Sequence, residues 1–220
     1  DSLVEDMEAA GLFSILVPKR WGGAGLGPRE VHKVVEIIST GDCSLGWVSS
    51  FYILHNWFLC RFPLEVQQEL YKGRSSVRIA AVFQPPGTTE KVPGGYRVNG
   101  RWGYATGMLH ASHAFVPVMV GEAAHWALVR RQDLEVMDDW FMSGMSATGS
   151  VTIVAKNAFV PDNCTYDIPK LMAPEGHHGT MHPEEVHHYP FTALMMSPIS
   201  LTIGALEAAV DPEVAPLEQS

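Results

Sequence analysis

Two residues of this sequence combine an aromatic ring with a polar group, and their spacing brings them together if the chain is helical there. Trp47 and His55 are eight residues apart, so a helix would present both on one side. An imidazole with its ordinary pKa of about 6.5 can accept or donate a proton near neutral pH. Phe51 and Leu59 continue the same stripe, and such a stripe is typical of a helix that faces a core. His55 therefore has two interpretations, a residue that handles a proton and a residue of the core.

A second group of residues places large aromatic rings beside small residues and one hydroxyl. It is the run Arg101-Trp102-Gly103-Tyr104-Ala105-Thr106-Gly107. Such a mixture suits a flat ligand that lies against backbone, with the Thr106 hydroxyl at the edge of the ligand. The alternative is a strand that simply ends in a glycine turn, and the sequence leaves both open.

Small and hydroxyl-bearing residues are concentrated in a third segment, directly before a β-branched run. This segment is Gly144-Met145-Ser146-Ala147-Thr148-Gly149-Ser150. Its backbone amides and hydroxyls can surround a cofactor. It lacks the Lys-Ser/Thr ending of a nucleotide-phosphate loop, so we interpret it as a candidate cofactor contact of another kind.

Five histidines lie close together in the sequence and raise the question of a metal site: His177, His178, His182, His187 and His188. Imidazoles can hold a transition metal, but Pro183 interrupts the segment and no helical spacing presents two rings together. We expect a solvated loop or the rim of a pocket, and no metal. The sequence has no Gly-x-Ser-x-Gly segment, so nucleophilic hydrolysis has no support.

The composition limits the classes of function. Hydrophobic residues make up 46% of the chain and charged residues 18%, which is enough apolar material for a folded core. The formal net charge is −9 and the basic residues are scattered, which argues against a nucleic-acid partner. No apolar run approaches the ~18 to 20 residues of a membrane span, and the first residues do not resemble a signal peptide. Three cysteines without a C-x-x-C pattern fit a reducing compartment, so we expect a cytoplasmic protein.

The first part of the chain, residues 1–75, predicts a helical domain that would carry Trp47 and His55. Helices are expected near 29–40, from a cap at Asp42 or Ser44 to about 62, and from 63 to 71. Near the other end, residues 166–190 are expected to form a loop. Residues 191–220 contain one apolar helix at about 199–209, and an apolar helix needs partners on several sides.

The central part, residues 76–165, predicts a β domain that would carry the other two segments. Strands without an intervening helix are expected at 77–83, 96–102, 114–120, 125–131, 134–138 and 151–159. Asn99-Gly100 predicts a turn. The fold class is therefore α+β, with an antiparallel barrel or sandwich at its centre.

The three segments together, in this order, resemble the acyl-CoA dehydrogenase superfamily. Within it, the chain is similar to the two-component flavin-dependent monooxygenases, such as the oxygenase component of 4-hydroxyphenylacetate 3-monooxygenase. The likeness covers about residues 3 to 209. Its motifs are Ala10-Gly11-Leu12 through Pro18 with Trp21-Gly22-Gly23, Gly94 through Trp102 with Thr106-Gly107, and Gly144-Met145 through Ser150 with Phe159-Val160-Pro161.

The resemblance implies a fold, a cofactor and partners. It implies a helical N-terminal domain, a central β domain and a C-terminal four-helix bundle, of which this sequence supplies only the start. The flavin would lie between the β domain and the bundle. A separate flavin reductase would supply reduced FMN or FADH₂, which with O₂ would hydroxylate a phenolic or related small molecule. A homo-oligomer is also implied, which in the family is a tetramer.

The resemblance also implies roles for individual residues. Thr106 would bond the flavin near N5, and His55 would orient or deprotonate the substrate, so these two are the expected catalytic residues. Trp47 and His55 would bind the substrate. The expected flavin contacts are Phe83, Gln84, Trp102, Thr106, Thr148 and Ser150.

Two alternatives to a monooxygenase remain at this stage. The dehydrogenases of the superfamily usually carry a Thr-Glu-Pro-x-x-Gly-Ser-like stretch where this chain has Phe83-Gln84-Pro85-Pro86-Gly87-Thr88-Thr89. That difference favours the monooxygenases over flavin oxidation of a thioester. A truncated homologue without catalytic activity is the other alternative.

Overall fold

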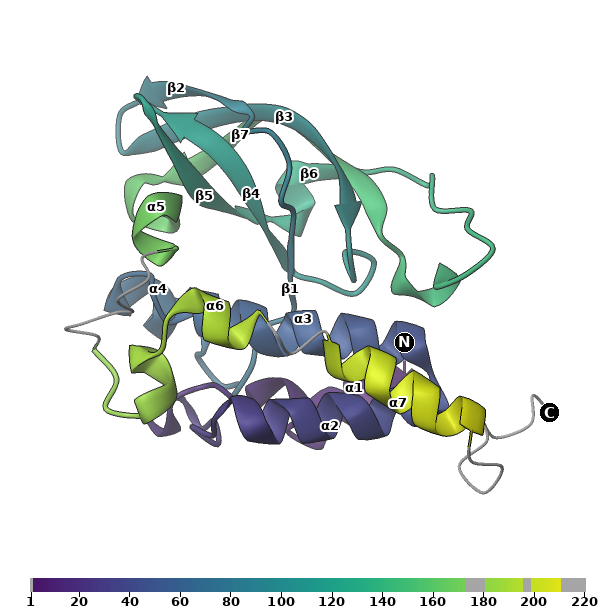
Figure 1. The fold of residues 1–220 in the computed structure, drawn as a ribbon. Helices are drawn as coiled ribbons and strands as arrows, with labels where there is room; N and C mark the ends of the chain where they lie inside the picture. Colours follow the sequence, from purple (N-terminus) through teal and green to yellow (C-terminus); the bar gives the residue numbers. More distant parts are fainter. Residues whose placement is uncertain (1, 173–180, 196–198, 211–220) are drawn as a thin grey trace.

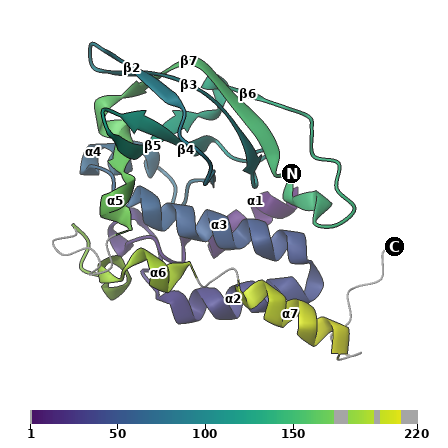
Figure 2. The same cartoon turned by 45° about the horizontal axis from the view of Figure 1, so that its top comes forward.

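The computed structural model describes residues 2–172, 181–195 and 199–210 (Figure 1), and the structural statements below concern these residues. The helices are α1 (Ser2–Ala9), α2 (Pro28–Gly41), α3 (Cys43–Leu59), α4 (Leu64–Leu70), α5 (Ile168–Leu171), α6 (Phe191–Leu194) and α7 (Ile199–Val210). The strands are β1 (Ile79–Ala81), β2 (Thr88–Val92), β3 (Gly95–Ala105), β4 (His113–Val120), β5 (Ala123–Arg130), β6 (Leu134–Val136), β7 (Val151–Pro161) and β8 (Thr165–Asp167). Figures 1 and 2 show α3 between the strands on one side and α2 with α7 on the other.

Helix α3 begins where its cap satisfies the first backbone amides. Asp42 Oδ1 accepts a hydrogen bond of 2.6 Å from the Leu45 amide, so Asp42 and not Ser44 is the cap. The helix ends at Leu59, about three residues before the predicted end. Almost every side chain after Val48 is buried, because α3 packs against α2 on one side and β1 on another.

The strands form two four-stranded sheets packed face to face. One sheet has the order β1-β4-β5-β8, with β1 and β4 parallel and the other pairs antiparallel. The second sheet, β2-β3-β7-β6, is antiparallel throughout. The predicted α+β class is confirmed, and the β part is a sandwich; the described strands do not close into a barrel.

The predicted turn at Asn99-Gly100 is wrong, because both residues lie inside β3. The Asn99 side chain instead holds a bulge, accepting from the Asn157 amide at 2.8 Å and donating to the Asn157 side chain at 3.1 Å. The chain turns earlier, at Pro93-Gly94, where Gly94 has φ +80°. The prediction also missed β2, and the stretch expected to be a loop contains α5 and part of the first sheet's edge strand β8.

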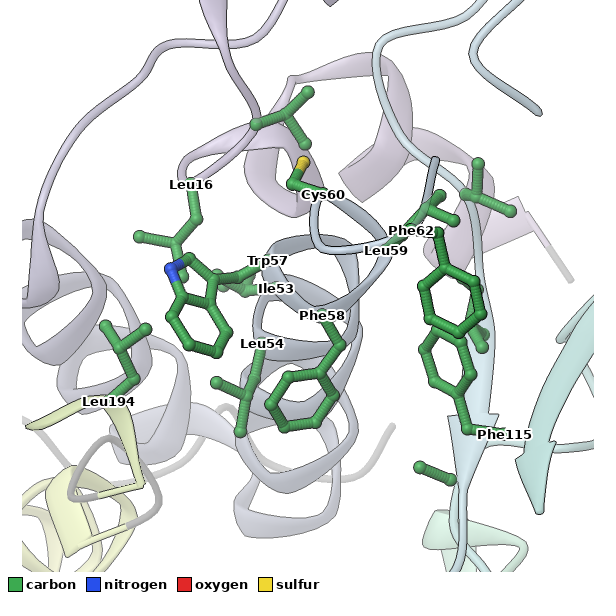
Figure 3. Close-up of a cluster of buried hydrophobic side chains, with 14 of the residues drawn as sticks. Leu16, Ile53, Leu54, Trp57, Phe58, Leu59, Cys60, Phe62, Phe115 and Leu194 are labelled. Atoms are coloured by element: carbon green, nitrogen blue, oxygen red, sulfur yellow. The ribbon is translucent and has the colours of Figure 1, made fainter. Parts of the chain in front are cut away.

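Two hydrophobic cores lie on opposite faces of β4 and β5. Phe115 and Trp126 face α3 with their rings stacked at 5.7 Å, whereas Val116 and Ala127 lie between the two sheets. Successive residues of a strand point to opposite faces, so both strands are buried on both sides. Figure 3 shows the α3 core, where the Phe62 and Phe115 rings stack at 5.4 Å.

Helix α7 packs closely on α2. A side chain at Gly204 would collide with the Glu36 carbonyl oxygen, so this approach needs a glycine. One turn earlier, Ser200 Oγ lies 2.6 Å from His32 Nδ1. The opposite side of α7 leaves four large apolar side chains exposed: Ile199, Ile203, Leu206 and Val210.

The expectation that no apolar stretch reaches membrane length is wrong. The 20 residues Phe191–Val210 are long and apolar enough to cross a membrane by length and composition, with a mean hydropathy of 1.5. This stretch includes residues 196–198, which lie outside the described residues. Core helices of soluble proteins satisfy the same criterion, so a single stretch of this kind decides little.

Candidate active site

A cavity of about 560 Å³ lies where α3, the end of β1, the end of β3, the 140–150 segment and α7 meet. This volume is in the range of ~300 to 1,000 Å³ that small-molecule sites occupy. Its lining is Trp47, Phe51, Ala81, Phe83, Gln84, Gly103, Tyr104, Thr106, Trp140, Met145, Thr148, Ser150 and Leu201. Six of the eight predicted site residues are in this set, and the other two, His55 and Trp102, are not.

The α3 wall of the cavity is aromatic. Trp47 and Phe51 both line it, with ring centroids 4.8 Å apart in an edge-to-face arrangement. His55 is the next residue of the stripe, and its ring lies 5.5 Å from that of Phe51. It is only 1% exposed, so the predicted substrate residue lies next to the cavity wall and not on its surface.

The protonation of His55 follows from its surroundings. Its Nδ1 lies 2.6 Å from the Ile79 carbonyl oxygen, which can only accept, so Nδ1 carries the proton and Nε2 has the lone pair. Nε2 is buried with no hydrogen-bond partner in the part of the chain that the structure describes. Burial lowers the pKa of His55 to about 4, and the bond to Ile79 opposes this only in part. At neutral pH the ring is an uncharged acceptor.

Three hydroxyls form a row on the wall made by the end of β3 and the 144–150 segment. Ser150 Oγ lies 2.8 Å from Thr106 Oγ1 and 2.8 Å from Thr148 Oγ1. All three residues are at least nine-tenths buried, and all three line the cavity. The row is therefore a preformed polar edge in a mainly apolar space.

Backbone contacts hold this row in place. The Gly107 amide donates to the Thr148 carbonyl at 3.0 Å, which ties the end of β3 to the 144–150 segment. The Tyr52 hydroxyl of α3 donates to the Gly107 carbonyl at 2.5 Å. Gly107 has φ +75°, and a side chain there would collide with that hydroxyl, which explains why a glycine follows Thr106.

The structure places Trp102, an expected flavin contact, away from the cavity. Its ring is 1% exposed in the core between the sheets, and a side chain at Gly87 or Gly100 would collide with it. Tyr104 lines the cavity instead and is 68% exposed. The two residues differ because the pairing of β3 with β7 shifts between Trp102 and Ala105, and Tyr104 adopts φ +58° there.

Phe83 and Gln84 follow β1 and complete the cavity near Tyr104. The Phe83 ring packs edge-on against Trp126, with centroids 5.1 Å apart, and more than half of its surface is exposed. Gln84 Oε1 accepts a hydrogen bond from the Gly103 backbone amide at 3.2 Å. The side-chain NH₂ of Gln84 is therefore the group of this residue that can still donate. Both residues are on the lining, where the sequence placed them.

Two of the three histidines described in this segment are buried, and the third, His188, is exposed. His182 and His187 are buried with ring centroids 5.0 Å apart, and His182 Nε2 contacts Gln67 Oε1 at 2.9 Å. Arg61 donates to the His187 carbonyl at 2.7 Å. His177 and His178 lie outside the described residues. Within those residues no group of three or more metal-ligating side chains exists.

Seven lining residues were not identified from the sequence as site residues: Phe51, Ala81, Gly103, Tyr104, Trp140, Met145 and Leu201. Tyr104 and Met145 lay inside segments that the sequence singled out, but strand alternation gave no reason to prefer Tyr104 to Trp102. Trp140 is tied to Met145, whose carbonyl accepts from the indole at 3.4 Å. Leu201 belongs to α7, and no pattern in the sequence connects it with α3.

Comparison with known proteins agrees with this architecture. Residues 1–74 match the family described as acyl-CoA dehydrogenase, N-terminal domain. A pigment production hydroxylase of Rhodococcus sp. (strain ATCC 21145) is 33% identical over 217 residues, covering 96% of this chain and 56% of that protein. HsaA is the oxygenase subunit of a flavin-dependent monooxygenase of Mycobacterium tuberculosis (strain CDC 1551 / Oshkosh). It is 36% identical over 166 residues, covering 73% of this chain and 42% of HsaA. The chain spans about half the length of the curated relatives it matches.

A solved structure shares the fold. XiaF from Streptomyces sp., in complex with FADH2 and glycerol, superposes with a TM-score of 0.88 at 28% identity, over 95% of this chain and 54% of that one. The chain belongs to the acyl-CoA dehydrogenase superfamily, as its helical N-terminal part, its two packed sheets and these relatives show, and its relatives there include flavin-dependent monooxygenases.

Proposed function

We propose that the cavity binds reduced FMN or FADH₂ together with a small phenolic or related molecule, and that the protein is the oxygenase component of a two-component flavin-dependent monooxygenase. The observation that carries this proposal is the row of Thr148, Ser150 and Thr106 hydroxyls, facing a cavity whose other lining residues are mainly aromatic or aliphatic. A flavin ring has flat apolar faces and one polar edge of nitrogen and oxygen atoms, which fits such a cavity. A reduced flavin is also supported by two relatives, since HsaA is named a flavin-dependent monooxygenase and XiaF was solved in complex with FADH2.

The residues present can hold a flavin on both its edge and its faces. Thr106 offers a hydroxyl to the polar edge, and Gln84 offers an amide NH₂ nearby. Tyr104 and Trp140 meet edge-on with centroids 6.0 Å apart, and both line the cavity as a surface for the ring. When bound, reduced flavin supplies the electrons with which O₂ is activated.

The α3 wall is proposed to hold the substrate. Trp47 and Phe51 provide an apolar surface for an aromatic ring. His55 Nε2 is a fixed acceptor beside that surface, and leaving a buried acceptor unpaired is costly unless a ligand pairs with it. We therefore assign His55 to accept the hydrogen bond, and then the proton, of the substrate hydroxyl.

The wider assembly is also part of the proposal. A separate flavin reductase would deliver the reduced flavin, and the protein would work as a cytoplasmic homo-oligomer without nucleic acid or membrane. The exposed apolar side of α7 supports further helical packing in such an assembly. A mainly apolar lining, to which α7 contributes Leu201, would help to keep water from the reacting atoms.

Anaerobic titration tests the proposal. Reduced FMN and FADH₂ are added separately, and quenching of tryptophan fluorescence is followed, since Trp47 and Trp140 line the cavity. At least one of the two should bind with a Kd in the micromolar range. NADPH lacks the flavin ring and serves as the control ligand. Absence of binding by both reduced flavins would overturn the proposal.

A further inference from the structure

The hydroxyl row carries one proton per oxygen, and this restricts how its hydrogen bonds can run. Ser150 stands in the middle, 2.8 Å from each neighbour. A hydroxyl donates only once, so Ser150 donates to one threonine and accepts from the other. If Ser150 accepted from both, its own proton would lack a protein acceptor among the described residues. Both bonds therefore point the same way along the row.

The two possible directions present different groups to the cavity. When the bonds run from Thr148 through Ser150 to Thr106, the Thr106 proton is free to donate to a ligand. When they run the other way, Thr106 gives its proton to Ser150 and turns a lone pair toward the ligand. The reversal needs only the rotation of three hydroxyl protons, with no movement of heavier atoms.

A flavin requires this ability at one position of its polar edge. The ring nitrogen N5 carries no proton in the oxidised flavin and accepts a hydrogen bond, whereas it carries one in the reduced flavin and donates. A single fixed donor suits only the first state. Thr106 alone can rotate, but a buried proton left without an acceptor costs more than an unused lone pair.

We propose that Ser150 is a positioning residue that acts through Thr106, because it takes up or returns the Thr106 proton as the flavin changes redox state. This inference rests on the proposed function and adds a redox-dependent role for the row. Thr148 completes it by accepting from Ser150 when Thr106 acts as the acceptor, and the Thr148 proton is then left to the cavity, which Thr148 also lines. The row matters most for the reduced flavin, because only in that state does the Thr106 proton need Ser150 as its acceptor.

The prediction concerns the ratio of two dissociation constants. In Ser150→Ala, the Thr106 proton has no acceptor when N5–H donates to Thr106. Binding of reduced FMN should weaken by about fivefold or more, and binding of oxidised FMN by less than about twofold. Thr148→Val should raise the ratio of the reduced-FMN Kd to the oxidised-FMN Kd by a smaller factor. Ser150→Thr keeps a hydroxyl and should return this ratio to the value of the unmodified protein.

The experiment measures Kd for oxidised FMN in air and for reduced FMN anaerobically, with the FAD pair in parallel, alongside the melting temperature of each variant. Ser49→Ala is the matched control, since Ser49 is a fully buried serine of α3 with no hydrogen-bond partner among the described residues. It should leave both constants unchanged. If Ser150→Ala does not fold, Thr148→Val decides the same question.

The outcomes separate the inference from the proposed function. If the unmodified protein binds neither redox state of FMN or FAD, the proposed function fails and the inference fails with it. If it binds flavin but the Ser150→Ala and Thr148→Val variants weaken both redox states equally, or neither, the inference alone is overturned. A selective loss of reduced-flavin binding supports both.

Discussion

The two walls of the cavity are built in opposite ways. The α3 wall is a regular helix, and its lining residues Trp47 and Phe51 follow from simple four-residue spacing. The wall formed by β3 and the 144–150 segment depends on irregular backbone. Among the described residues, three other than glycine have positive φ, namely Tyr104, Met145 and Asn157, and the first two line the cavity.

The walls also differ in how their polar groups are satisfied. The hydroxyls of the β3 side are bonded to one another, whereas His55 beside the α3 wall keeps an unpaired Nε2 in the described structure. Left-handed backbone costs a residue other than glycine roughly 1–2 kcal/mol, and such strain concentrates at functional sites. Under the proposed function, the irregular wall binds the polar edge of the flavin, and His55 beside the regular wall accepts a hydrogen bond from the substrate.

The largest expected effect separates Trp102 from Tyr104, two residues apart on the same strand. Trp102→Ala removes a fully buried ring and should cost about 3–5 kcal/mol of unfolding free energy. Tyr104→Ala removes an exposed ring and should change stability by less than about 1 kcal/mol, while weakening flavin binding. Urea denaturation and flavin titration measure the two effects. Equal destabilisation by both variants would show that the bulge does not turn Tyr104 away from the core.

The next effect concerns His55 on the regular wall. If Nε2 receives the substrate proton, His55→Ala should leave reduced-flavin binding nearly intact and lower the product formed per flavin consumed by about 10²-fold or more. Hydrogen peroxide should replace the lost product. Normal coupling in a variant that is merely less stable would make His55 a core residue.

The pH dependence of stability gives His55 a second, independent test. The pKa is about 6.5 in an unfolded chain and about 4 in the folded protein, so only the unfolded state is protonated between these values. Stability should therefore fall as the pH drops from 6.5 toward 4, by up to about 1.4 kcal/mol per pH unit from this residue. His55→Gln should flatten that part of the profile in chemical denaturation. An unchanged slope would mean that the ring is not buried in its neutral form.

A smaller effect is expected at Thr106. Thr106→Val keeps the shape of the side chain and removes its hydroxyl, and one such bond is worth roughly 0.5–1.5 kcal/mol. Reduced-flavin binding should weaken by about 2- to 13-fold, with a matching rise in peroxide released per flavin oxidised. Thr40→Val is the control, because its hydroxyl bonds the Ile37 carbonyl on the exposed side of α2. Unchanged peroxide release would remove Thr106 from the site.

The smallest effect tests the strain itself. Met145 has φ +56°, so Met145→Gly relieves left-handed strain but adds chain entropy to the unfolded state, for a net gain of about 0.5–1 kcal/mol. Flavin binding should weaken slightly as the segment loosens. Asn157→Gly, with the same φ away from the cavity, is the control for flavin binding, which it should leave unchanged; it also removes the bond from Asn99, so its stability is not compared. A loss of stability in Met145→Gly would contradict the strain assigned to this wall.

The sequence by itself determined the regular parts of this protein. The α3 stripe, a cap at Asp42 or Ser44, most strands and the segments containing Thr106, Thr148 and Ser150 follow from local periodicity, turn chemistry and motif resemblance. These features depend on residues a few positions apart, so they are visible in a linear pattern. Six of the eight predicted site residues line one cavity for the same reason.

Only the tertiary structure decided which residues of those segments face the cavity. Tyr104 replaces Trp102 because pairing with β7 forces a bulge that the β3 sequence does not encode on its own. His55 lies behind Phe51 because Ile79, 24 residues away, holds its ring. Leu201 reaches the lining because Gly204 lets α7 approach α2. Each of these outcomes depends on contacts between distant segments, and their energies exist only once the segments are packed together.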